Sequence, residues 1–110
     1  MRTGANTMSS KKWFKKIQKE RDRQDSMWGE QNHKDGTHHS FKSVLEECRS
    51  NNTSNIIYGD QNWLAILLEE VYEVASELSP TALKEELVQV AAVAVAWLEC
   101  IDRREKSVTS

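Results

Sequence analysis

The chain has 110 residues, of which 29% are charged and 38% hydrophobic, so it forms at most one domain with a single modest core. Its formal net charge of −2 excludes the strongly basic balance of proteins that bind nucleic-acid backbones or anionic membranes. It has no signal peptide and no run of ~18 apolar residues, and its cysteines, Cys48 and Cys100, form no CxxC pair. We therefore expect a cytoplasmic protein with reduced thiols that binds neither nucleic acid nor membrane.

The N-terminal part of the chain is mostly polar. Residues 1–10 are small and polar and are predicted to form a disordered tail. A first helix is predicted over residues 10–27, followed by a polar loop over residues 29–40 that is rich in turn-forming residues. A basic stretch within the first helix is either a solvated helix face or a contact for an anionic ligand or partner. Its members are Lys11, Lys12, Lys15, Lys16, Lys19, Arg21 and Arg23.

The middle of the chain is predicted to contain one short helix between two polar loops. Ser40 is a suitable cap for a helix that ends at Arg49. Residues 50–55 are predicted to form the second polar loop. Residues 55–58 contain a strand-like pair of β-branched residues, but the segment is too short to build a sheet.

The C-terminal part is predicted to form two long helices. Asp60 is a good N-cap for a helix over residues 60–78. Ser79 followed by Pro80 predicts the start of the last helix, since proline is favoured at the first helical position. This helix is expected to reach about Arg104. The predicted fold is therefore all-α.

Most apolar residues lie between Ile56 and Ile101, so the core is expected to come from the C-terminal half. We predict a single helical domain over residues 11–104 and a C-terminal tail over residues 105–110. Two long helices make a thin core, which favours oligomerisation as a way to bury the remaining apolar surface.

Several glutamates gather on one side of the predicted helix over residues 60–78. They are Glu69, Glu70, Glu73 and Glu77, and they fall within an arc of about 100°. The side opposite is apolar, so one interpretation is an ordinary amphipathic helix with a solvated acidic face. However, like charges four residues apart destabilise a helix, which favours a binding role instead.

Glu86 stands at the head of residues 87–98, a run without a formal charge. The residues that share its side of the helix are Val90, Val93 and Trp97. A carboxylate on an apolar face must be paired, protonated or bound to a cation, and no basic residue of matching pattern precedes it. Several acids converging between two helices indicate a divalent metal. Gln89, one turn further on, is a neutral oxygen ligand on the border of the same face.

Two segments carry a resemblance to a known family. Residues 68–73 (LEEVYE), followed after a short gap by residues 85–90 (EELVQV), resemble the EExxE…ExxD signature of MazG-like all-α nucleoside triphosphate pyrophosphatases. Residues 20–25 (ERDRQD) and 28–36 (WGEQNHKDG) resemble the N-terminal stretch of a small MazG-like branch found in bacteria and phages. The similarity covers roughly residues 20–104.

The resemblance implies a helical bundle that binds Mg²⁺ or Mn²⁺ and hydrolyses a nucleoside triphosphate to the monophosphate and pyrophosphate. Such cations neutralise the polyphosphate and lower the pKa of a bound water. By position, Glu70, Glu73 and Glu86 are implied as metal ligands. Glu69 is implied as a further ligand or as the catalytic group that orients the attacking water. The family's final aspartate falls on Gln89, an uncharged ligand, so a reduced metal affinity and activity are expected.

Polar residues near the first loop are candidates for binding the base or sugar of the substrate. They are Trp28, Gln31, Asn32 and His33, although Trp28 is alternatively a packed core residue. We expect a homodimer or homotetramer. Two other interpretations stay open. One is a non-catalytic nucleotide- or metal-binding member of the same fold, and the other is a structural protein whose Val93 and Trp97 seam forms an interface.

Overall fold

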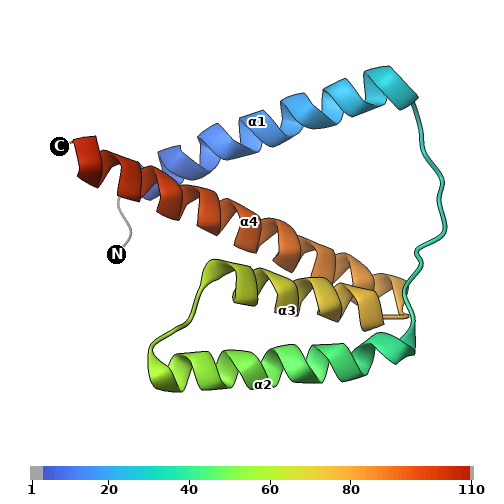
Figure 1. Ribbon diagram of the computed structural model, residues 1–110. Coiled ribbons are helices and arrows are strands. Elements are labelled where there is room, and N and C mark those ends of the chain that lie inside the picture. Colours follow the sequence, from blue (N-terminus) through green and yellow to red (C-terminus); the bar gives the residue numbers. More distant parts are fainter. Residues whose placement is uncertain (1–3, 110) are drawn as a thin grey trace. The chain divides into compact units, whose positions relative to one another are not determined.

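The computed structural model describes the backbone of residues 4–109 and the exposure of residues 10–107. Its elements are, in chain order, α1 (Gly4–Trp28), the 3-10 helix η1 (His39–Phe41), α2 (Lys42–Tyr58), α3 (Trp63–Ser76) and α4 (Pro80–Thr109) (Figure 1). No strand occurs in this part of the chain, which confirms the all-α prediction. None of these helices is long and apolar enough to cross a membrane.

The chain divides into two compact units, and α4 contributes to both. Unit 1 consists of Met1–Lys34 and Val95–Ser110, so it contains α1 and the second half of α4. Within unit 1, the Asp102 carboxylate accepts a hydrogen bond from the indole Nε1 of Trp13 at 2.8 Å and pairs with the Lys12 ammonium at 3.2 Å. Unit 2 consists of Asp35–Ala94, so it contains η1, α2, α3 and the first half of α4.

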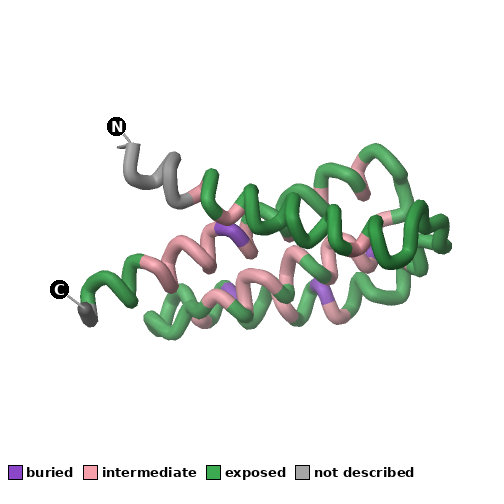
Figure 2. The backbone as a smooth tube through the Cα atoms, turned by 90° about the horizontal axis from the view of Figure 1, so that it is seen from above, coloured by how far each residue is buried: buried purple, intermediate pink, exposed green. Residues whose placement is uncertain are grey.

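The packing of α2 against α3 in unit 2 buries a polar side chain. Leu45 and Asn52 are the buried residues of α2, with exposed fractions of 4% and 7%. The Asn52 amide nitrogen donates to the backbone carbonyl of Ala65 at 3.1 Å and to Glu69 Oε1 at 2.8 Å. Few positions are buried among the described residues (Figure 2), and Asn52 is one of them.

Local signals account for the helix ends. Gly59 ends α2 with a φ of 73°, a left-handed conformation that glycine adopts without strain. The Asn62 side chain caps α3 by accepting a hydrogen bond from the Ala65 amide at 2.9 Å. Asn62 therefore takes the capping role that the sequence had suggested for Asp60. Pro80 is the first residue of α4, as predicted.

The prediction of a loop over residues 50–55 and a strand-like segment over residues 55–58 was wrong. Both segments belong to α2, which runs without a break from Lys42 to Tyr58. Their polar residues have modest helix propensity, but propensity is a weak preference that packing overrides. The buried amide nitrogen of Asn52 donates two hydrogen bonds to acceptors on α3, and the helical register here places it to do so.

Other helix boundaries also differ from the predictions. The tail predicted over residues 1–10 is helical from Gly4 onwards, and residues 1–3 lie outside the described residues. The last helix continues to Thr109 because a formed helix propagates readily through residues such as Glu105 and Lys106. By contrast, α3 ends at Ser76, since the Glu77 side chain turns to accept hydrogen bonds from backbone amides beyond it.

Many large apolar side chains are exposed. Those in unit 2 with more than half of their area exposed are Ile56, Ile57, Tyr58, Leu64, Leu78 and Val88. Those in unit 1 are Phe14, Met27 and Trp28. An apolar surface of this extent is more than isolated exposed residues account for. It agrees with the expectation that the core formed by one copy of the chain is thin.

We predict that Asn52→Ala destabilises the folded protein by about 1–3 kcal/mol, because Ala65 and Glu69 lose a buried hydrogen-bond donor. The measurement is the free energy of unfolding from urea denaturation followed by circular dichroism. The neighbouring Asn51 is exposed and is the matched control, with an expected change within about 0.5 kcal/mol for Asn51→Ala. Equal effects of the two substitutions would contradict this role of Asn52.

Candidate functional site

The glutamates of α3 are turned partly into unit 2. Glu69, Glu70 and Glu73 are half-buried, and only 23% of the Glu73 side chain is exposed. On the same helix, Leu64 and Leu68 are exposed. Leu67 and Val74, on the apolar side of α3, are also half-buried, so the acidic side of this helix is not clearly the more solvated of the two. An acidic face that packs inward requires compensating groups or a ligand.

Glu86 of α4 joins this cluster. Partial burial is the largest cause that raises the pKa of Glu70, and the negative charge of Glu86 is the next. Partial burial also raises the pKa of Glu86, followed by the charges of Glu73 and Glu77. Glu70 and Glu86 have no hydrogen bond or ion pair with another described side chain. The two carboxylates are therefore partly desolvated and unpaired, and the nearby Arg49 charge offsets the rise of their pKa values only in part.

Two residues that the sequence did not single out contact the cluster from α2. Arg49 Nη2 forms an ion pair with Glu73 Oε1, and Arg49 Nη1 pairs with Glu46 of its own helix at 2.8 Å. Asn52 holds Glu69 through the hydrogen bond of 2.8 Å. A signal was available, since Leu45, Arg49 and Asn52 follow spacings of four and three residues and so share one helix face. The predicted loop over residues 50–55 concealed it.

Glu77 and Gln89 differ from the other predicted ligands in their surroundings. Glu77 Oε1 accepts hydrogen bonds from the backbone amides of Leu78 at 3.0 Å and Ser79 at 3.1 Å, so it caps the turn after α3. Gln89 lies on α4 and is exposed. The structure thus brings Glu69, Glu70, Glu73 and Glu86 together in unit 2, whereas Gln89 stands at a solvent-accessible position of the same unit.

The donor set suits a hard cation held by two carboxylates. Among the described residues, no group of three or more His, Cys, Asp or Glu side chains is arranged to hold a metal ion. One reason is that Glu73 is paired with Arg49 and Glu69 with Asn52. Mg²⁺, however, is commonly held by one or two carboxylates together with waters and substrate phosphates. Glu70 and Glu86 offer oxygen ligands of that kind and fit this mode.

The predicted base- or sugar-binding residues belong to unit 1, at the end of α1 and in the segment after it. Trp28 is 59% exposed, so it is not a core tryptophan. Asn32 donates to Glu30 Oε2 at 2.9 Å, and the His33 ring lies 3.0 Å from Gln31 Oε1. All four side chains, Trp28, Gln31, Asn32 and His33, are exposed and open to contact with a ligand.

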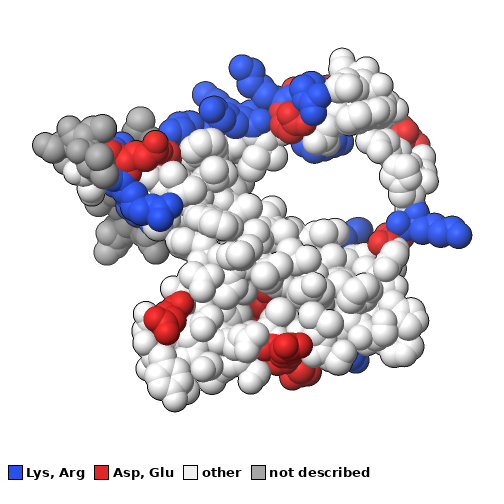
Figure 3. Space-filling model, in the orientation of Figure 1, with Lys and Arg blue, Asp and Glu red and all other residues white. Residues whose placement is uncertain are grey.

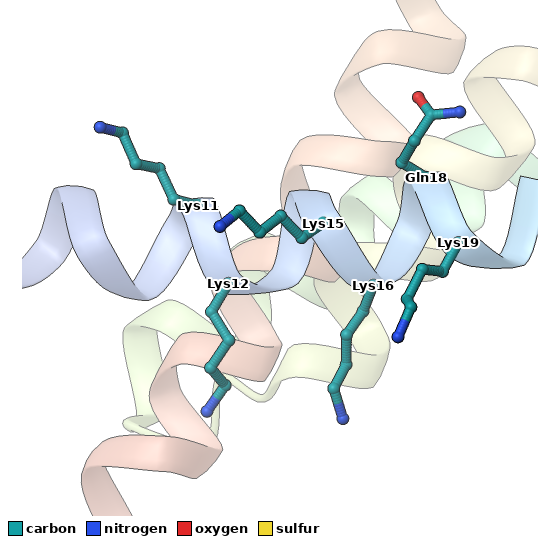
Figure 4. Close-up of a pocket in the computed structure, with 6 residues that line it drawn as sticks. All are labelled: Lys11, Lys12, Lys15, Lys16, Gln18 and Lys19. Atoms are coloured by element: carbon teal, nitrogen blue, oxygen red, sulfur yellow. The ribbon is translucent and has the colours of Figure 1, made fainter.

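A second charged feature is the basic face of α1. Lysine side chains gather along this helix in the surface view (Figure 3), and Figure 4 shows them projecting from it around a shallow hollow. The lining residues are Lys11, Lys12, Lys15, Lys16, Gln18 and Lys19. The ammonium groups of Lys12 and Lys16 lie 4.7 and 5.2 Å from the centre of the Trp13 ring. The face is exposed, as both interpretations of this stretch require.

Comparisons of the chain with protein-family models, with curated proteins and with solved structures find no match. The MazG-like resemblance therefore depends on the motif residues alone. Of these, Glu69, Glu70, Glu73 and Glu86 lie together, from two helices of one compact unit.

We predict that Glu86→Gln stabilises the protein at neutral pH and that this gain shrinks as the pH falls towards about 4.5. The pKa of Glu86 is raised in the folded state, so between the unfolded and folded pKa values the folded state binds more protons. Stability contributed by the protonated group is therefore lost as the pH rises through the folded pKa. The measurement compares urea midpoints of both proteins across this range in the presence of a chelator.

Glu47→Gln is the control for this comparison, because Glu47 is an exposed carboxylate in unit 2. Its unfolding midpoint should follow that of the unchanged protein at every pH. A difference between Glu86→Gln and the unchanged protein that stays constant with pH would show that Glu86 ionises as freely in the folded state as in the unfolded chain.

Proposed function

We propose that this chain is a MazG-like, metal-dependent nucleoside triphosphate pyrophosphohydrolase, which converts an NTP or dNTP to the monophosphate and pyrophosphate. The observation that carries the proposal is the pair of carboxylates without a hydrogen-bond or ion-pair partner in the described part of the chain, Glu70 from α3 and Glu86 from α4, whose pKa values are raised by partial burial and by neighbouring carboxylates. Carboxylates with raised pKa values that lie near one another are a common feature of functional sites. The reaction class is taken from the resemblance of the EExxE motif on α3 to the MazG-like signature.

In this proposal Glu70 and Glu86 hold Mg²⁺ or Mn²⁺, with Glu73 as a further ligand. The cation supplies charge neutralisation for a triphosphate and acidifies a coordinated water. Because the substrate phosphates provide the remaining oxygen ligands, the cation and the nucleotide are expected to bind together.

Glu69 is the proposed catalytic group. The Asn52 amide fixes Glu69 Oε1, which leaves the second carboxylate oxygen to accept a proton from the attacking water. The water oxygen bonds to the α phosphorus, the bond from that phosphorus to the α–β bridging oxygen breaks, and pyrophosphate leaves. Asn52 is thus a positioning residue for the proposed base, in addition to its role in packing.

The setting of the proposed enzyme follows from two further observations. Cys48 and Cys100 are both free thiols, which supports the cytoplasm as the compartment. The exposed apolar residues of unit 2 support a homodimer or homotetramer, since a second copy would remove them from water.

A non-catalytic nucleotide- or metal-binding protein of the same fold is the second candidate. The observation in its favour is Gln89, a neutral and exposed residue where the family signature has an aspartate. A purely structural helical protein is a third reading, and it requires that divalent ions leave the melting temperature unchanged.

We predict pyrophosphate release from at least one member of a panel of canonical and modified nucleoside triphosphates in the presence of Mg²⁺ or Mn²⁺. Glu70→Gln and Glu86→Gln should each lower the rate roughly 100-fold or more, the scale of losing one preorganised electrostatic contact with the transition state. Glu85→Gln, an exposed neighbour on α4, should retain most of the activity. Release that survives both cluster substitutions, or no release from any triphosphate, would overturn the proposal.

We also predict that Gln89→Asp lowers the Mg²⁺ concentration needed for half-maximal activity, because a formal negative charge is added beside the cation site. The effect should be several-fold, since Gln89 is exposed and water screens its interactions. The measurement is a Mg²⁺ titration of pyrophosphate release at saturating substrate. An unchanged half-maximal concentration would show that Gln89 is not what limits this site.

A further inference from the structure

Beside the acidic cluster, unit 2 contains a cavity of about 400 Å³, a size that accommodates small ligands. It lies between the start of α2 and the end of α3, and both helices and η1 line it. Its basic lining residues are His39, Lys42 and Arg49. Its acidic lining residues are Glu46, Glu73 and Glu77, of which Glu73 also belongs to the acidic cluster. One cavity therefore adjoins both a group of cationic side chains and the carboxylates of the candidate metal site.

Of the cationic side chains that line this cavity, Arg49 has ion-pair partners and Lys42 has none within the described chain. The Lys42 ammonium has no ion pair or hydrogen bond with any described residue, and Lys42 is exposed. Arg49 is held by carboxylates on two sides, Glu46 and Glu73, yet 44% of its side chain is exposed. Its guanidinium is therefore accessible to a ligand in the cavity as well as to these two carboxylates. A free ammonium beside a guanidinium that can turn is an arrangement suited to an anion with several charged oxygens.

We propose that this cavity binds the polyphosphate chain of the nucleotide, with Lys42 and Arg49 as its ligands, and that Arg49 passes from Glu73 to the phosphate when the chain binds. The inference rests on the proposed function for the identity of the substrate, and it adds residues and a partner exchange that the acidic motifs do not contain. Lys42 and Arg49 are positioning residues here, because they hold the distal phosphates away from the bond that breaks.

This change of partner by Arg49 couples the binding of the cation at the acidic cluster to the binding of the polyphosphate in the cavity. While Arg49 is paired with Glu73, that carboxylate is neutralised, and Glu70 and Glu86 remain as the unpaired ligands. When Arg49 turns to the phosphate, Glu73 becomes available as a third oxygen ligand. Polyphosphate binding thereby strengthens cation binding, and by linkage the cation strengthens polyphosphate binding to the same extent. This coupling also accounts for the absence of a three-ligand group among the described residues.

The test uses inorganic tripolyphosphate and Mn²⁺ as separate probes, each titrated into the full chain by calorimetry. Lys42→Met should weaken tripolyphosphate binding about tenfold or more, the scale of losing one charge-assisted hydrogen bond, and should leave Mn²⁺ binding unchanged. Arg49→Met should weaken tripolyphosphate binding by a similar factor and strengthen the binding of Mn²⁺ alone several-fold, because Glu73 is released. Lys84→Met, an exposed lysine on α4, is the matched control and should change neither.

Arg49→Met is expected to weaken the binding of tripolyphosphate and to strengthen the binding of Mn²⁺. A substitution that only damaged the fold would weaken the binding of both probes. Tripolyphosphate affinity that is unaffected by Lys42→Met and Arg49→Met overturns the inference, even if the protein hydrolyses nucleotides. Conversely, tripolyphosphate binding that depends on Lys42 and Arg49 in a protein without hydrolytic activity supports the inference and overturns the proposed function. Helix content measured by circular dichroism verifies that each variant is folded.

Discussion

The α2 helix carries one buried leucine, Leu45, and beside it polar side chains that bond to α3. Asn52 is buried and donates to the Ala65 carbonyl and to Glu69, and one turn away Arg49 pairs with Glu73. Buried polar groups are stable only when their partners are in place, so this interface accepts one register and few others. The helical state of residues 50–58, the inward turn of the glutamates and the position of the cavity all depend on it.

The same interface leaves an electrostatic imbalance in unit 2. Glu69 and Glu73 have partners on α2, whereas Glu70 and Glu86 have none among the described residues. Partial burial and the repulsion of neighbouring carboxylates raise the pKa values of Glu70 and Glu86. A fold selected for stability alone would replace such a pair by apolar residues. A bound cation would relieve this repulsion, which is the physical argument for the proposed cation site.

Outward-facing apolar residues are the counterpart of this inward-facing charge. Because α3 turns its glutamates into unit 2, Leu64 and Leu68 face outwards, and Ile56 and Ile57 at the end of α2 are also exposed. Water disfavours such a surface. The arrangement that builds the site therefore also builds a surface that a second copy of the chain would cover, so the proposed oligomer and the proposed site share one cause.

The sequence by itself determined the helical class, the start of α4 at Pro80 and the grouping of glutamates on one side of α3, because these follow from local backbone preferences and from helical spacing. It also pointed to Glu86 as a carboxylate in need of a partner. Only the tertiary structure decided that residues 50–58 continue α2 and that Arg49 and Asn52 reach the cluster. Helical spacing fixes which residues share a face but not which face turns inward, since that choice depends on partners distant in the chain.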